Sequence, residues 1–154
     1  MRLADYDYTT PGVYFVTICS HNRIPLFGNI ESGVMNLSLF GEAVSVTWQN
    51  LPQFFNVRLD EYTIMPNHLH GILWINPPEN DQSQSSFISI IKSFKSLSSK
   101  RIHQSGFSEV VWQRSYYETI IRNKDQLNAA REYIKNNPIN WAKDSDFVSY
   151  VGQG

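Results

Sequence analysis

Two histidines separated by a single residue are the sharpest chemical feature of the sequence. They are His68 and His70, on either side of Leu69, in an apolar stretch that favours a β-strand. Side chains two residues apart on a strand project from the same face, here roughly 7 Å apart along the strand, while Leu69 points the other way. Two neutral imidazoles so placed can bind one divalent metal ion. From the spacing alone, two histidines with no common ligand are the more frequent explanation.

A tyrosine and an asparagine near the C-terminal end have helical spacing. Tyr133 and Asn137 are four residues apart, which places them on one face of a helix about one turn apart. A tyrosine can act as a covalent nucleophile, and an amide oxygen can be a third metal ligand. Read alone, Tyr133 is more simply a tyrosine at the edge of the core and Asn137 a helix C-cap.

Together these residues would suit the cleavage of a phosphodiester. A phenol has a pKa of about 10, so at neutral pH it needs help to ionise, which a metal ion would supply. The protein ligands would all be neutral, and the phosphodiester would bring the negative charge. Exposed aromatic residues such as Trp112 or Tyr117 could stack unpaired bases. Five basic residues are candidates for contacting the rest of the nucleic-acid backbone: Lys92, Lys95, Arg114, Arg122 and Lys135.

The charge is unevenly distributed along the chain. The net charge of −1 argues by itself against a nucleic-acid-binding protein. Residues 92–135, however, contain nine basic and four acidic residues, against four and ten in the rest of the chain. This asymmetry permits one positive and one negative face.

Length and composition indicate one soluble domain. The 154 residues fit a single domain over 1–154, and a hydrophobic content of 42% supports one core. The single cysteine, Cys19, excludes an internal disulfide and points to a reducing compartment. There is no apolar run at the start and no stretch of about 18 apolar residues. We therefore expect a cytoplasmic protein with no membrane association.

The pattern of apolar residues predicts seven main elements. Strands are expected at 12–20, 57–65, 68–76 and 110–122, and helices at 38–50, 86–103 and 125–136. Ser38 and Asp125 can cap the first and last helices, and Pro52 and Pro138 should end them. Residues 22–36 should be irregular or a short hairpin, and 77–86 a flexible loop. The order β-α-β-β-α-β-α predicts an α+β fold, an antiparallel four-stranded sheet with helices packed on one face.

Several blocks of sequence carry a family resemblance that spans nearly the whole chain. They are residues 11–17 (PGVYFVT), 23–28 (RIPLFG), 65–72 (MPNHLHGI), 112–114 (WQR) through 121–122 (IR), and 133–138 (YIKNNP). In these blocks, in this order, the chain resembles the REP-associated tyrosine transposases. These are relatives of the single-tyrosine insertion-sequence transposases in the HUH endonuclease superfamily.

The resemblance implies a fold, a reaction and a set of site residues. The fold would be a ferredoxin-like α+β core, and the protein a homodimer. The metal ligands would be His68, His70 and Asn137, the nucleophile Tyr133 and the metal magnesium or manganese. The reaction would cleave single-stranded, hairpin-forming DNA to a 5′-phosphotyrosine and a free 3′-hydroxyl, followed by strand transfer.

Other functions remain open at this point. Tyr116 and Tyr117 are alternative phenols, although neither comes with an amide one helical turn away. A metal nuclease that activates water would leave Tyr133 structural. A catalytically inactive, domesticated protein would bind DNA hairpins without cutting them. A structural zinc site at the histidines is a weaker possibility, because closed sites of this kind usually contain cysteine.

Overall fold

An antiparallel sheet forms the centre of the computed structural model, which describes residues 12–77 and 86–141. Its strands are β1 (Gly12–Cys19), β4 (Val57–Met65), β5 (His68–Ile75) and β6 (Tyr117–Ile121). They lie in the order β4-β5-β1-β6, and every neighbouring pair is antiparallel. The two strands that carry most of the apolar residues, β1 and β5, are therefore central, and each is buried on both faces.

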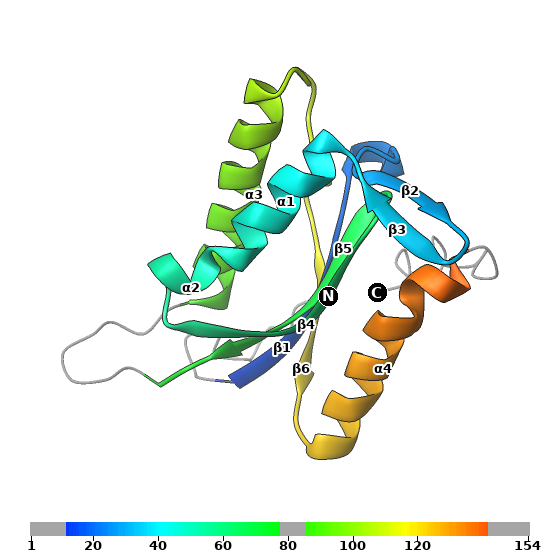
Figure 1. The fold of residues 1–154 in the computed structure, drawn as a ribbon. Helices are drawn as coiled ribbons and strands as arrows, with labels where there is room; N and C mark the ends of the chain where they lie inside the picture. The colour runs from blue at the N-terminus through cyan, green and yellow to red at the C-terminus, as the bar shows by residue number, and fades with distance from the viewer. Residues whose placement is uncertain (1–11, 78–85, 142–154) are drawn as a thin grey trace.

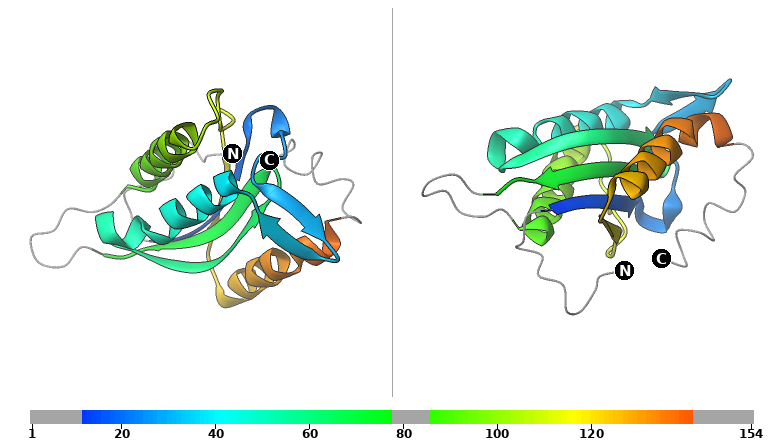
Figure 2. Two further views of the ribbon diagram at one scale, coloured as in Figure 1. Left: turned by 45° about the horizontal axis from the view of Figure 1, so that its top comes forward. Right: turned by 90° about the horizontal axis from the view of Figure 1, so that it is seen from below.

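The helices cover both faces of this sheet. One face packs against α1 (Leu39–Gln49) and α3 (Phe87–Gln104), and the other against α4 (Lys124–Asn140) (Figures 1 and 2). The remaining elements are the short helices η1 (His21–Arg23) and α2 (Leu51–Phe54) and a hairpin of β2 (Gly28–Glu31) and β3 (Val34–Leu37). The predicted α+β class with a ferredoxin-like order of elements is confirmed. The arrangement differs in one respect, because α4 lies on the opposite face from α1 and α3.

Alternation along the central strands explains the two faces. In β5, Leu69 and Leu73 pack toward α1 and α3 in the larger core cluster. Ile72 packs with Leu127 and Ile134 of α4 in a separate cluster on the opposite face. Because the side-chain period of a strand is two, His68 and His70 share the face of Ile72. The histidines therefore lie under α4 and outside the main core.

Caps and prolines set the helix ends, with two departures from expectation. The side chain of Ser38 caps α1 by accepting from the amide of Gly41, as predicted. Helix α4 is capped by Asn123 and not by Asp125, which lies in its first turn. The helix also continues through Pro138, so Asn137 lies inside it and not at its end. Pro138 gives up one helical hydrogen bond, but buried Ile134 and Asn137 hold the last turn against the sheet.

The segment before β6 is not the strand that its composition predicts. Of the expected strand at 110–122, only Tyr117–Ile121 is a strand, and Trp112 forms an isolated bridge with Ser20. Trp112 is 5% exposed, and its indole donates to the hydroxyl of Ser98 at 2.9 Å. The apolar and aromatic residues here pack into the core without joining the sheet, and Trp112 is not exposed for base stacking as expected.

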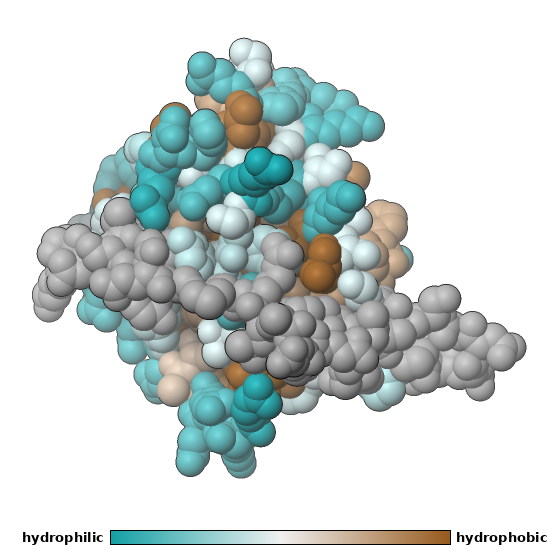
Figure 3. All heavy atoms as spheres, turned by 180° about the vertical axis from the view of Figure 1, so that it is seen from behind, coloured by the Kyte–Doolittle hydropathy of each residue, from teal (hydrophilic) through white to brown (hydrophobic). Residues whose placement is uncertain are grey.

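One face of the molecule is largely polar. The described residues visible from behind are mostly hydrophilic, with hydrophobic side chains scattered among them (Figure 3). No helix within residues 12–77 and 86–141 is long and apolar enough to cross a membrane. Most of the loop predicted at 77–86 lies outside the described residues.

Candidate active site

The two histidines of β5 lie side by side under α4. Their ring centroids are 4.5 Å apart, with 70° between the ring planes, and both side chains are fully buried. The geometry agrees with the same-face placement that strand alternation predicts. Two imidazole nitrogens can therefore be directed at one point between the rings.

Hydrogen bonds to Nδ1 fix the orientation of both rings. Nδ1 of His68 lies 2.8 Å from the side-chain oxygen of Asn67, whose amide nitrogen donates to the carbonyl of Arg23. An amide oxygen only accepts, so Nδ1 of His68 carries the proton and Nε2 keeps a lone pair. Nδ1 of His70 lies 2.7 Å from the hydroxyl of Thr17 on β1, which can accept in the same way. Partners of this kind are what orient metal-binding histidines.

Burial keeps both imidazoles neutral. It lowers the pKa of His70 from 6.5 to about 3. The pKa of His68 also falls well below 6.5, first because of burial and then because of His70, against a raising effect of a hydrogen bond with Asn137. At neutral pH both rings are therefore in the form that binds metal ions.

Helix α4 brings the phenol and the amide to the histidines. The ring of Tyr133 meets that of His70 edge-on, with centroids 5.2 Å apart and 64° between the planes. One turn later, the side chain of Asn137 is 6% exposed and lies close enough to His68 to raise the pKa of that imidazole against the effect of burial. Trp141 stacks on His68 with centroids 6.2 Å apart. Two imidazoles, a phenol and an amide thus converge within a single chain.

An aromatic residue of β1 joins the strand and helix sides of the site. Phe15 stacks on His70 with centroids 5.5 Å apart and meets Tyr133 edge-on at 6.2 Å. Sequence reasoning missed both Phe15 and Thr17. Their spacing of two along a strand was visible, but their place beside His70 depends on the pairing of β1 with β5, in which Thr17 lies opposite His70.

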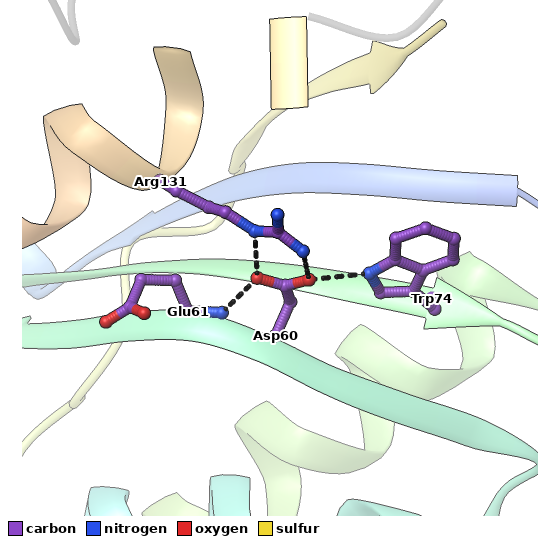
Figure 4. Close-up of polar contacts among 4 residues, drawn as sticks. All are labelled: Asp60, Glu61, Trp74 and Arg131. Carbon is purple, nitrogen blue, oxygen red and sulfur yellow. Dashed lines mark hydrogen bonds and ion pairs between the residues drawn. The ribbon is translucent and has the colours of Figure 1, made fainter. Parts of the chain in front are cut away.

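An ion pair fixes α4 on β4. The guanidinium of Arg131 donates two hydrogen bonds to the carboxylate of Asp60, at 2.8 and 2.7 Å (Figure 4). The same carboxylate accepts from the indole of Trp74 at 2.9 Å and from the amide of Glu61 at 2.7 Å. The hydrogen bonds from Arg131 hold the pKa of Asp60 well below its usual range. We call this pair the Asp60–Arg131 clamp. Its arginine lies on α4, two residues before Tyr133.

The five candidate DNA-binding residues do not form one surface. Arg122 and Lys135 are exposed on the layer of β6 and α4 that carries the site. Lys92 and Lys95 lie on α3, so the sheet separates them from the histidines. Lys95 also donates to the carbonyls of Gln113 and Arg114, at 2.8 and 3.0 Å, and holds that segment on α3. Arg114 is exposed within it.

The side chains of His68, His70 and Asn137 fit a divalent cation of which they would fill only part of the coordination shell. Among the described residues, no three histidine, cysteine, aspartate or glutamate side chains gather in one place. A cation at the histidines would therefore have two imidazole nitrogens and the amide oxygen of Asn137, with positions left for a substrate. Such an incomplete shell is typical of catalytic sites and not of closed structural ones.

Solved structures share this fold. A REP-associated tyrosine transposase bound to a REP hairpin superposes with a TM-score of 0.65 at 20% identity, over 92% of this chain and 74% of the other. A putative transposase from Deinococcus radiodurans superposes with a TM-score of 0.56 at 15% identity, over 88% and 96%. These two likenesses show that the described part of the chain has the fold of both proteins.

Sequence relatives agree with the fold. The family model "Transposase IS200 like" matches residues 32–137, and the chain belongs to this family. An uncharacterized protein of Haemophilus influenzae is 39% identical over 96% of this chain and 92% of its own length. A "Putative REP-associated tyrosine transposase" of the same organism is 27% identical over 86% and 73%.

Proposed function

We propose that this transposase cuts and rejoins single-stranded, hairpin-forming DNA through a covalent bond between Tyr133 and a 5′-phosphate. The observation that supports it is the convergence of the Tyr133 phenol with the two buried, neutral imidazoles of β5. A purely structural role for Tyr133 would not explain why the two imidazoles beside it are each oriented by a hydrogen bond at Nδ1.

The reaction balances with the groups present. The phenol oxygen of Tyr133 loses its proton to water and attacks the phosphorus, forming a phosphotyrosine bond. The bond from phosphorus to the 3′ oxygen breaks, and that oxygen takes up a proton to become a hydroxyl. Strand transfer is the reverse attack by a 3′-hydroxyl on the phosphotyrosine, which releases the phenol.

A magnesium or manganese ion fits the site. His68 and His70 would bind it through Nε2, and Asn137 through its amide oxygen. When bound, such an ion polarises the phosphate and lowers the barrier to ionising a nearby phenol. Because these ligands are neutral, the negative charge in the site would come from the substrate itself.

The rest of the chain positions these groups and the DNA. Thr17 and Asn67 hold the imidazoles, and the Asp60–Arg131 clamp holds the helix that carries the phenol. We propose that Arg122 and Lys135, which are exposed on the layer of β6 and α4, contact phosphates of the DNA. The fold neighbour is bound to a REP hairpin, and we propose a DNA hairpin as the substrate here as well. Every proposed catalytic group lies in one chain, so the proposal does not depend on the predicted homodimer.

The test is a search for the covalent intermediate. Labelled hairpin oligonucleotides with single-stranded flanks are incubated with the protein and manganese and run on a denaturing gel. We expect a slow, protease-sensitive band that disappears in Tyr133→Phe. The matched control is Tyr117→Phe, which removes another partly buried phenol from the same face of the sheet.

The competing functions give different results. If the DNA is cut without forming an adduct, and cutting persists in Tyr133→Phe, the protein is a nuclease that activates water. Hairpin binding that is insensitive to chelator, with no cleavage, would show a hairpin-binding protein.

A further inference from the structure

A groove opens beside Tyr133 on the side away from the clamp. It lies between the edge strand β6 and helix α4 and has a volume of about 380 Å³. Its lining includes Phe15, Thr119, Ile121, Gln126, Ala129 and Tyr133. The volume is within the range of about 300–1,000 Å³ that is usual for small-ligand pockets. The phenol proposed as the nucleophile is therefore one wall of a second, separate space.

The lining of this groove is uncharged and partly aromatic. It combines the rings of Phe15 and Tyr133 with aliphatic side chains, and its polar groups are the hydroxyl of Thr119 and the amide of Gln126. The amide oxygen of Gln126 accepts from the backbone of Arg122 at 2.8 Å, which leaves its nitrogen as a donor. Such a surface does not suit a phosphate, but it suits a flat, neutral heterocycle with hydrogen-bonding edges.

The charge around the groove indicates what its occupant is attached to. Ile121 and Gln126 both line the groove, and the turn between them carries two exposed cations, Arg122 and Lys124, and one exposed carboxylate, Asp125, so it has a net positive charge. An anionic backbone passing along this turn would be attracted to the rim, while its base entered the uncharged interior. Phe15, which lines the groove, stacks on His70 and meets Tyr133 edge-on. The groove therefore lies next to the proposed active site.

We propose that this groove binds one unstacked nucleobase of the DNA strand, next to the phosphate attacked by Tyr133. The inference rests on the proposed function, because it places the base relative to the reacting phosphate. The bound base would fix the position of that phosphate along the strand, so the groove serves to choose the bond that is cut.

A binding experiment without cleavage tests the groove. The probes are a random-sequence single-stranded oligonucleotide pool and an abasic deoxyribose-phosphate chain of the same length, both with chelator present. The wild-type protein should prefer the base-bearing strand by roughly tenfold, as expected for one stacked base. Ala129→Leu puts a branched, ringless side chain into the groove and should remove most of this preference, while binding of the abasic chain stays unchanged.

A matched variant keeps the result interpretable. Asn128→Leu adds the same side chain to the same helix, at an exposed position that does not line the groove, and should keep the preference. Thermal unfolding of both variants checks that they fold alike. The proposal would be overturned if Ala129→Leu preferred the base-bearing strand as strongly as the wild-type protein does. It would also be overturned if both variants lost this preference.

Failure of the proposed function would look different. Absence of any covalent adduct from the wild-type protein, with the base preference present and sensitive to Ala129→Leu, would leave the base site standing and remove the nicking reaction. An adduct that forms at the same bond and rate in Ala129→Leu would remove the role of the groove in choosing that bond.

Discussion

The rings of Tyr133 and His70 meet at 64° between their planes, with centroids 5.2 Å apart, within one chain. The tyrosine comes from the last helix and the histidine from a central strand. Their meeting depends on how α4 lies across the sheet, which the Asp60–Arg131 clamp and the contacts of Ile72, Leu127 and Ile134 determine. The site is thus sensitive to residues that take no part in the chemistry.

Thr17→Val should weaken metal binding without removing a ligand. The substitution keeps the shape of the side chain but removes the hydroxyl that engages Nδ1 of His70. Loss of such a partner typically lowers metal affinity about 10- to 100-fold. Manganese titration followed by calorimetry measures the change. Thr119→Val, at another threonine on the same face of the sheet, should bind manganese as the wild-type protein does, and an equal loss in both would contradict the role of Thr17.

Asp60→Asn should loosen the helix that carries Tyr133, the proposed nucleophile. It weakens the paired hydrogen bonds to Arg131, and we expect a loss of about 1 kcal/mol in the free energy of unfolding, because solvent reaches the guanidinium. Adduct formation should slow more than hairpin binding weakens, because attack needs the phenol in one position, whereas a long exposed side chain such as Lys135 on the same helix can follow a phosphate when the helix shifts. Single-turnover kinetics and binding assays measure the two effects. Glu61→Gln, which leaves the clamp intact, is the control, and unchanged kinetics in Asp60→Asn would refute the positioning role.

Acid should destabilise the protein from about pH 6.5 downward. The pKa of His70 is lowered to about 3 and that of His68 lies well below 6.5, whereas in the unfolded chain both would protonate near 6.5. The unfolded state then binds more protons, so the free energy of unfolding should fall by up to about 1.4 kcal/mol per pH unit for each histidine.

Urea unfolding across this pH range measures the effect. A variant with both His68→Gln and His70→Gln should show a flatter profile between pH 6.5 and 4. The lowered pKa of Asp60 acts in the same direction, but its contribution is lost only below about pH 4, the ordinary pKa of an aspartate. A wild-type profile as flat as that of the double variant would contradict the neutral, buried state of the imidazoles.

Gly71→Ala should destabilise the fold from the face opposite the histidines. A Cβ atom at this position would lie 2.4 Å from the indole of Trp48, which has no room to move in the core. Overpacking of this kind typically costs about 1–3 kcal/mol. Equilibrium unfolding measures it, and adding Trp48→Phe should recover part of the loss if the indole is the cause. Additive effects of the two substitutions would show that they do not interact.

Patterns local in sequence predicted most of the fold and half of the site. Alternation placed His68 and His70 on one face, and helical spacing placed Tyr133 and Asn137 together, because both periods follow from backbone geometry alone. The aromatic residues near Trp112 were misread as a strand, since a core segment and a strand can have the same composition. Pro138 was misread as a helix end, because tertiary packing of Ile134 and Asn137 offsets its local effect.

The rest of the site depends on contacts between distant segments. Thr17 reaches His70 only through the pairing of β1 with β5, and Asp60 meets Arg131 only because α4 packs across β4. No local pattern marks either. The prediction of one basic surface failed for the same reason. Nothing in the sequence shows that α3, with Lys92 and Lys95, and α4, with Lys135, lie on opposite faces of the sheet.

Strand β5 works as a partition, with Leu69, Gly71 and Leu73 on one side and His68, His70 and Ile72 on the other. From His68 to Gly71, a mutational scan that scored protein abundance and activity separately should therefore alternate with a period of two, and at Ile72, which packs against α4, abundance should fall as well. Substitutions at Leu69, Gly71 and Leu73 would deplete the protein from the cell, while those at His68 and His70 would leave it abundant and inert. Substitutions at His68 and His70 can accordingly change the activity of this transposase while the residues that direct its folding stay the same.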